Sequence, residues 1–240
     1  MLTKPQDQQI RKQLDRHKVA TVPRFEDIQI TNAFRLEKFR INPDVFDASF
    51  MTSSKETARA LLEEDVVPLY RGKQALDMGC GSGIAGRVML EMGAEVVLSD
   101  ISEAAAKNAE ENVRDFGMRA VVLCGDLFEK VKELDTKFDF IVFNHPFFSG
   151  EPIENEPVSR AMLDPGGVLR RFLTEAKSYL EEGGSILMPY WHFAGSGKGS
   201  NDPAVYAVEY GYAVKEKVID VGAETIQNGT FSIYILKPKA

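Results

Sequence analysis

Three glycines, each separated by one residue, follow a short apolar run. The stretch ALDMGCGSG places Gly79, Gly81 and Gly83 directly after Asp77. Glycine tolerates positive φ and, because it has no Cβ, lets a ligand come close to the backbone. A dinucleotide-binding fingerprint would have its third glycine at the next position, where this chain has Ile84. The spacing therefore favours a ligand with no pyrophosphate to seat on the following helix.

Acidic residues lie at the ends of three predicted strands. Asp77 precedes the glycines, Asp100 ends the second strand, and Asp126 follows the third. A carboxylate at Asp100 could accept hydrogen bonds from both hydroxyls of a ribose, and Asp126 could accept one from an adenine amino group. Asp77 could meet a ligand ammonium, directly or through water. The alternative is a tight strand–helix turn with three surface acids that cap helices; the repetition favours a nucleoside site.

Strands that alternate with helices would bring these residues together at one edge of a sheet. Apolar runs predict strands at Gln74–Met78, Glu95–Asp100, Arg119–Gly125, Phe138–Asn144, Ser185–Trp191, Val214–Val221 and Thr230–Leu236. Helical patterns fall at Ala85–Met92, Ser102–Phe116, Val168–Leu180 and Val205–Tyr210. This alternation implies a mostly parallel sheet covered on both faces, which binds ligands beyond the carboxyl ends of its strands.

The start of the chain differs in character. Gln6–His17 is polar and suggests a helix, Ile28–Ile41 mixes aromatic and charged residues without a clear period, and Ser53–Leu62 resembles a capped helix. We expect residues 1–45 to form a short N-terminal extension or lid that faces the substrate. Residues 46–240 would then form the ligand-binding domain.

Composition indicates a globular protein: 44% of its 240 residues are hydrophobic and 27% are charged. No apolar run reaches the roughly 18 residues of a membrane span, and the start lacks the apolar core of a secretory signal. Two cysteines make no disulfide framework, so we expect a cytoplasmic protein. His17, His145 and His192 are not expected to bind metal. The net charge of -7 argues against a nucleic-acid partner, which would require a basic patch.

Together the motifs resemble the class I methyltransferase superfamily, whose cofactor is S-adenosylmethionine. ALDMGCGSG is similar to its first motif, VVLSD to its second, CGD to its third and FDFIVFN to its fourth. The resemblance covers about residues 45–240. It implies a Rossmann-like α/β fold with a seven-stranded sheet in the order 3-2-1-4-5-7-6 and the last strand antiparallel. It also implies that the cofactor is bound by Asp77, Gly79, Gly81, Gly83, Asp100, Ile101, Asp126, Leu127 and Asn144.

The fourth strand runs into Asn144, His145, Pro146 and Phe147, which resemble the N-P-P-[YF] motif of amino-group methyltransferases. That branch includes release-factor glutamine and adenine-N6 enzymes; Phe46–Ser53 and residues 156–184 are similar to segments of the glutamine enzymes. An amide or ring-attached amino nitrogen is a poor nucleophile because its lone pair is delocalised. Hydrogen bonds from its N–H groups to the Asn144 side chain and a backbone carbonyl would aim that lone pair at the methyl group. Pro146 stiffens the backbone, and Phe147 offers a face for stacking.

His145 departs from the motif, which has proline at this position. Histidine adds a backbone N–H and titrates near neutrality, so it could deprotonate an ammonium acceptor. The plainer interpretation is a histidine that only packs. The departure, together with an extension shorter than the helical domain of the release-factor enzymes, argues against protein glutamine as the acceptor.

The sequence therefore predicts an N-methyltransferase that acts on an amino or amide nitrogen of a small metabolite or natural-product precursor. The acidity and the short extension favour this over a protein or nucleic-acid adenine acceptor. Two other hypotheses are transfer to oxygen or of another alkyl group, and a non-catalytic cofactor-binding subunit. Further candidates for the acceptor pocket, each with core packing or solvated charge as the alternative, are Tyr190, Trp191, His192, Phe193, Arg160, Arg170 and Arg171.

Overall fold

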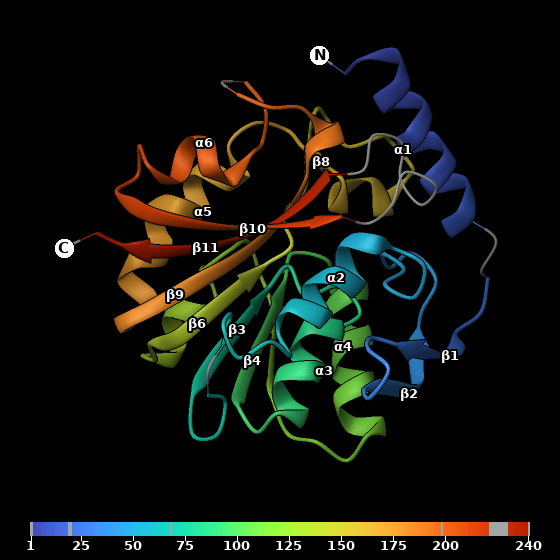
Figure 1. Ribbon diagram of the computed structural model, residues 1–240. Coiled ribbons are helices and arrows are strands. Elements are labelled where there is room, and N and C mark those ends of the chain that lie inside the picture. The colour runs from blue at the N-terminus through green and yellow to red at the C-terminus, as the bar shows by residue number, and fades with distance from the viewer. Residues whose placement is uncertain (1, 19–20, 68, 198, 221–229, 240) are drawn as a thin grey trace.

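A computed structural model describes residues 2–18, 21–67, 69–197, 199–220 and 230–239. Its centre is a seven-stranded sheet (Figure 1). The strands are β3 (Gln74–Met78), β4 (Glu95–Asp100), β5 (Val121–Cys124), β6 (Phe138–Phe143), β9 (Leu180–Trp191), β10 (Tyr212–Asp220) and β11 (Thr230–Pro238). They lie in the order β5-β4-β3-β6-β9-β11-β10, and β11 runs antiparallel to both its neighbours while the other pairs are parallel. This confirms the predicted Rossmann-like α/β fold and its strand order.

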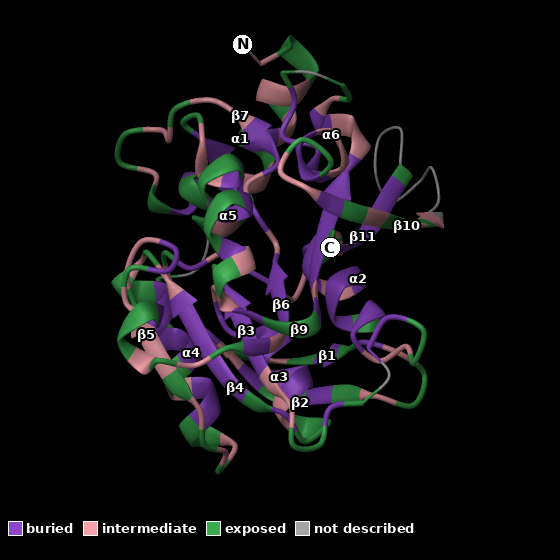
Figure 2. Ribbon diagram, turned by 90° about the vertical axis from the view of Figure 1, so that its left-hand side faces the viewer, coloured by how far each residue is buried: buried purple, intermediate pink, exposed green. Residues whose placement is uncertain are grey.

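Helices cover both faces of the sheet. On one face lie α2 (Thr52–Ala60), α3 (Ile84–Glu91) and α4 (Glu103–Asp115), and on the other lie α5 (Val168–Ala176) and α6 (Pro203–Ala207) (Figure 1). Leu76, Leu98, Ile141 and Ile186 on the middle strands are therefore completely buried, as the colouring of Figure 2 shows for these strands. Apolar side chains on both sides of a strand are typical of a parallel sheet between two helical layers.

Gly183 and Gly184 lie inside the first part of β9 rather than at the end of a helix. We expected a helix through Leu180 that ends at Gly183 and Gly184, but α5 ends at Ala176, a single 3₁₀ turn follows, and β9 begins at Leu180. The register of β6 against β9 shifts in this region. A Cβ on Gly184 would lie 2.9 Å from the carbonyl oxygen of Glu181. The glycines thus allow an irregular strand start rather than ending a helix.

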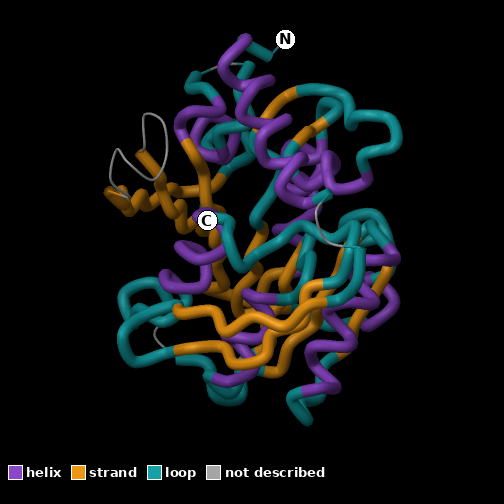
Figure 3. Tube along the Cα trace, turned by 90° about the vertical axis from the view of Figure 1, so that its right-hand side faces the viewer, coloured by secondary structure: helices purple, strands orange, loops and turns teal. Residues whose placement is uncertain are grey.

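The first part of the chain contains a helix and a hairpin. α1 (Lys4–His17) begins with a capping box from Thr3, and β1 (Arg24–Gln29) pairs antiparallel with β2 (Arg35–Ile41). The amino-acid pattern does not predict this hairpin, because a register shift breaks the two-residue alternation of side chains. Figure 3 views the molecule from the side that carries the hairpin.

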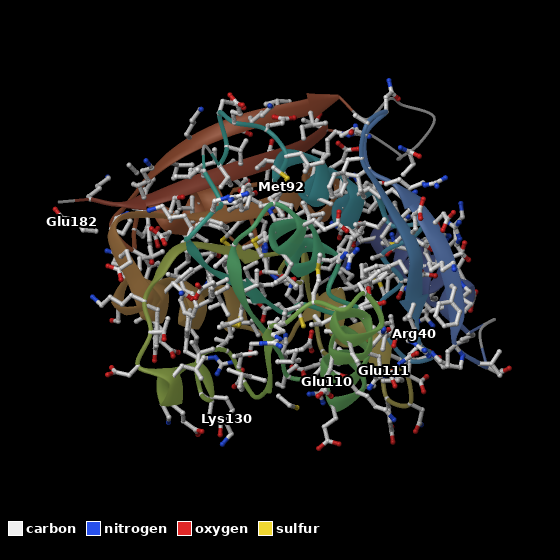
Figure 4. All side chains as sticks on the ribbon, turned by 90° about the horizontal axis from the view of Figure 1, so that it is seen from below. Arg40, Met92, Glu110, Glu111, Lys130 and Glu182 are labelled. Carbon is white, nitrogen blue, oxygen red and sulfur yellow. The ribbon has the colours of Figure 1, made fainter. Side chains whose placement is uncertain are left out.

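Helix α4 anchors the hairpin. The Asn112 side chain accepts a hydrogen bond from the Arg40 backbone N–H at 2.8 Å, and Asn108 accepts one from Asn42 at 2.9 Å. Arg40 also lies beside Glu111, 4.0 Å away (Figure 4). Polar side chains on a helix therefore complete the edge of the hairpin. The division of the chain at residue 45 stays a prediction.

Smaller differences concern the ends of elements. α6 begins at Pro203 rather than Val205 and is five residues long, with Asp202 as its N-cap. β10 begins two residues before the predicted strand, at Tyr212, and the predicted last residue of that strand, Val221, lies outside the described residues. Two-residue strands β7 (Phe148–Ser149) and β8 (Leu163–Asp164) form a separate small sheet. No helix in the described ranges is long and apolar enough to cross a membrane.

Candidate active site

A cavity of about 730 Å³ opens at the carboxyl ends of β3, β4 and β6. It brings together all but one of the residues predicted for the cofactor site and the acceptor segment: Asp77, Gly79, Gly81, Asp100, Ile101, Asp126, Leu127, Asn144, His145, Pro146 and Phe147 line it. Of the further candidates, Trp191, Arg160 and Arg171 line the cavity, and Tyr190, His192, Phe193 and Arg170 do not. Gly83 does not line the cavity. It has a φ of +85°, and a Cβ there would lie 3.2 Å from the Leu98 side chain. Gly83 therefore serves the packing of α3 against β4, beneath the loop.

The glycine loop is tied to the strand beside it. Gly79 and Gly81 have φ values of +62° and +55°, a conformation that glycine adopts without strain. The Gly81 N–H donates to the Asp100 carboxylate at 2.8 Å, and the Ser102 N–H donates to the other oxygen of Asp100 at 2.9 Å. Each of these oxygens keeps a free lone pair. The loop backbone and Asp100 thus form one rigid wall that fits the sugar of a nucleoside.

Asp77 lies beneath this loop and is 3% exposed. One of its carboxylate oxygens accepts a hydrogen bond from the Gly86 N–H at 2.7 Å. Burial raises the pKa of Asp77 to about 7, opposed by the bond from Gly86. A ligand cation would favour the charged form of this carboxyl group, as S-adenosylmethionine with its sulfonium and ammonium would. Gly86 is a site residue that was not predicted, although a glycine three residues after Gly83 is a signal for close helix–strand packing.

Asp126 has a partner that the sequence did not reveal. Arg171 on α5 donates to both of its carboxylate oxygens, at 2.7 and 3.0 Å. The Arg171 guanidinium uses one lone pair on each oxygen, so each can still accept a hydrogen bond from an amino group. Arg171 is therefore an ion-pair partner inside the site. Arg170 points elsewhere and donates to the Tyr206 hydroxyl at 3.1 Å.

The acceptor segment, residues 144–147, directly follows β6. The Asn144 side-chain amide has no hydrogen-bond partner among the residues that the structure describes, and it lines the cavity. The ring of Phe147 packs edge-on against that of Tyr190, with centroids 5.5 Å apart. Trp191 and Phe231 also line the cavity. Aromatic side chains thus line the same cavity as an amide that makes no hydrogen bond within the described residues.

His145 is 2% exposed and neutral at ordinary pH. Its Nε2 lies 2.8 Å from the carbonyl oxygen of Asn201. A carbonyl only accepts, so Nε2 carries the proton. Burial lowers the pKa of His145 to about 4, which makes it a weak base. The geometry thus favours the packing interpretation of His145 over general-base catalysis.

Helix α1 closes the outer side of the cavity. Gln9, Lys12, Gln13 and Arg16 line it, on one face of the helix. Figures 1 and 2 both place α1 beside the small sheet of β7 and β8. Two contacts hold it there: Lys18 pairs with Glu156 at 2.5 Å, and Gln6 donates to the Phe193 carbonyl at 3.1 Å. None of the four α1 residues that line the cavity was predicted for the site, although their spacing of three and four residues is a signal that they share one face of a helix.

The chain matches the methyltransferase small domain family over residues 39–196. It belongs to this family. Its relatives include the ribosomal RNA small subunit methyltransferase C of Haemophilus influenzae, 27% identical over 146 residues, which are 60% of this chain and 38% of that protein. A Methanocaldococcus jannaschii chain assigned as a protein N5-glutamine methyltransferase is 28% identical over 155 residues, 62% of this chain and 73% of that one. The chain thus spans well under half the length of the ribosomal RNA relative.

Solved structures share the fold. The Thermus thermophilus 16S rRNA N2 G1207 methyltransferase, in complex with AdoMet and guanosine, superposes with a TM-score of 0.65 at 23% identity, over 92% of this chain and 52% of that one. The ribosomal protein L11 methylase of Lactobacillus delbrueckii gives a TM-score of 0.61 at 17% identity, over 90% and 100%. The family match and the shared fold therefore agree on a methyltransferase small domain.

Proposed function

We propose that this methyltransferase transfers the methyl group to the nitrogen of a planar amino or amide group. The observation that carries the proposal is the Asn144 side-chain amide. It follows β6, lines the same cavity as the glycine loop, and is unpaired among the described residues. An amide oxygen in this place accepts an N–H of the acceptor and so aims its lone pair toward the cofactor side of the cavity.

The other residues fit a planar acceptor. Bound S-adenosylmethionine supplies an electrophilic methyl group. Phe147 offers an aromatic surface beside Asn144, against which a flat acceptor packs. His145 is a weak base. This suits a planar amino group as the acceptor, because such a group, unlike an ammonium, does not have to lose a proton before its nitrogen attacks. Asp77, Gly79, Gly81, Asp100, Ile101, Asp126 and Leu127 would hold the cofactor.

A small molecule is the acceptor class that we favour. Residues of α1 and of the segment 157–162 line the cavity, whose volume of about 730 Å³ suits a cofactor together with an acceptor of metabolite size. A second candidate is an amino group on an RNA base, since relatives are named as ribosomal RNA methyltransferases. Lys12, Arg16 and Arg160 line the cavity without an ion-pair partner in the described part of the chain, and such cations could contact phosphates.

Labelled cofactor distinguishes these acceptors. The protein is incubated with methyl-tritiated S-adenosylmethionine and separate small-molecule, protein and RNA fractions of an extract from the organism that encodes it. We expect label in the small-molecule fraction and none with Asn144→Ala. Label only in RNA or only in protein would replace the favoured acceptor class. Transfer that survives Asn144→Ala would favour transfer to oxygen, and cofactor binding without any transfer would favour a non-catalytic subunit.

A further inference from the structure

Asn201 contacts the acceptor segment from a distant loop. It lies between β9 and α6 and is 9% exposed. Its backbone carbonyl accepts the hydrogen bond from His145 at 2.8 Å, and its side-chain Nδ2 donates to the Pro146 carbonyl at 3.3 Å. The Ser149 hydroxyl donates to its Oδ1 at 3.3 Å. One residue thus makes three hydrogen bonds to residues in or next to the acceptor segment.

The acceptor segment has little other backbone support. β6 ends at Phe143, and the next backbone–backbone hydrogen bond runs from the Phe148 N–H to the Met162 carbonyl at 3.0 Å. Between them, residues 145–147 make no backbone–backbone hydrogen bond within the described ranges. The bonds from Asn201 are therefore the polar contacts that fix the path of this segment across the cavity wall.

The loop that carries Asn201 is itself held at both ends. The Tyr190 hydroxyl on β9 donates to the Gly195 carbonyl at 2.8 Å. Asp202, the next residue after Asn201, accepts a hydrogen bond from the Ala204 N–H at 3.0 Å and so caps α6. Gly195 has a φ of +123°, which only glycine adopts readily. Asn201 is thus attached to a strand and to a helix, and can hold the segment that it contacts.

We propose that Asn201 is a positioning residue of the methyl-transfer site, which sets the place of Asn144 and Phe147 through its bonds to His145 and Pro146. The proposal rests on the function proposed for Asn144. It also explains the departure from the N-P-P-[YF] motif: His145 replaces a proline, and its side chain provides a bond to a distant loop where proline would have provided local stiffness.

Two substitutions separate the bonds that Asn201 makes. Asn201→Ala removes both side-chain bonds and keeps the backbone carbonyl that pairs with His145. Asn201→Asp keeps an acceptor for Ser149 but turns a carboxylate oxygen toward the Pro146 carbonyl, which removes the donor. Asn32→Ala, in an exposed turn between β1 and β2, is the matched control.

The first measurement is transfer from methyl-tritiated S-adenosylmethionine into the extract fraction that the wild type labels. We expect both Asn201 variants to be slower by roughly 10- to 100-fold, because small misplacements at a reacting centre have effects of this size. The ratio of the wild-type rate to the variant rate should be the same at every dilution of the extract, because the substitution removes alignment rather than acceptor binding. The Kd for S-adenosylmethionine, measured by calorimetry, should stay within about twofold of the wild type. Unchanged transfer, or a cofactor Kd that weakens as much as transfer slows, overturns the proposal.

The second measurement needs no acceptor. In isotope-labelled protein, the NMR signals of the Asn144 side-chain amide and the Phe147 ring should shift in both Asn201 variants, while those of Gly79 and Gly81 stay in place. Signals of Asn144 and Phe147 that are unchanged overturn the proposal. If the wild type labels no fraction, the function proposed above fails, and this comparison still decides the role of Asn201. If either variant does not fold, Ser149→Ala, which removes one bond to Asn201, is examined for the same shifts.

Discussion

Arg171 on α5 donates hydrogen bonds from Nη1 and Nη2 to the two carboxylate oxygens of Asp126, at 2.7 and 3.0 Å. This ion pair connects α5 to the Asp126 carboxylate, which we expect to accept a hydrogen bond from the adenine amino group. It is half exposed, at 51% for Arg171 and 40% for Asp126, so its contribution is modest. We expect Arg171→Ala to weaken S-adenosylmethionine binding by up to about fivefold, because the carboxylate loses its fixed orientation.

Isothermal titration calorimetry with S-adenosylmethionine measures this effect. The neighbouring Arg170→Ala is the control, because Arg170 contacts Tyr206 rather than Asp126. Tighter binding by Arg171→Ala would show instead that Arg171 competes with the cofactor for Asp126.

Asp77 should couple cofactor binding to proton release. Burial raises the pKa of Asp77 to about 7, so the carboxyl group is partly protonated at neutral pH and a bound cation would drive the proton off. We expect the affinity for S-adenosylmethionine to rise about tenfold per pH unit while pH lies below the pKa, and to level off above it. The folded state holds this proton more tightly than the unfolded chain, in which the carboxyl group titrates near 3.8, so this contribution to the stability of the free protein should be lost as pH rises from about 4 to about 7.

Calorimetry in two buffers of different ionisation enthalpy counts the released proton. Asp77→Asn should bind more weakly and show no dependence of this kind. A flat pH profile in the wild type would rule out contact between Asp77 and a cofactor cation.

His145 should make the fold sensitive to acid. Burial lowers the pKa of His145 to about 4, whereas an unfolded histidine titrates near 6.5. Between these values the unfolded chain binds a proton and the folded one does not, so stability is lost as pH falls. The contribution of His145 to this loss should approach about 3 kcal/mol at about pH 4, while Asp77, which changes in the opposite sense, contributes equally to the wild type and to a His145 variant.

Urea unfolding at about pH 7 and about pH 4.5 measures this change. His145→Gln keeps a donor for Asn201 and does not titrate, so its stability should fall less with acid. His17, whose pKa burial also lowers, contributes equally to both proteins. Equal acid sensitivity of the variant and the wild type would contradict the assignment.

Gly86 should be less tolerant of substitution than Gly81. A Cβ at Gly86 would lie 2.5 Å from a Leu98 methyl carbon and 3.1 Å from the Asp77 carboxylate. We expect Gly86→Ala to lower the free energy of unfolding by about 1–3 kcal/mol, because the added methyl group would overlap Leu98 and force α3 away from β4. Gly81→Ala meets no atom within 4 Å and only incurs the cost of a φ of +55°, about 1 kcal/mol. Denaturant unfolding without cofactor compares them, and equal losses would contradict the packing argument.

The sequence was most informative where a pattern is local. Apolar runs and turn residues located the strands of the main sheet. The spacing of Gly79, Gly81 and Gly83 pointed to a loop at the carboxyl end of β3, where Gly79 and Gly81 line the cavity. Patterns failed where a partner lies far along the chain. Arg171 meets Asp126 across 45 residues, and His145 meets Asn201 across 56. Nothing in the local composition of either segment signals such a pair, because only the fold brings its members together.

The position of α1 has a consequence for the order in which the molecule is built. Gln6 contacts a carbonyl 187 residues further along the chain, so α1 can complete its docking only after β9 has joined the sheet. Until then its two buried side chains, Ile10 and Leu14, remain in water. Contacts between residues this far apart form slowly. Docking of α1 should therefore be a late step of folding, and the glycine loop will exist before the cavity above it is closed.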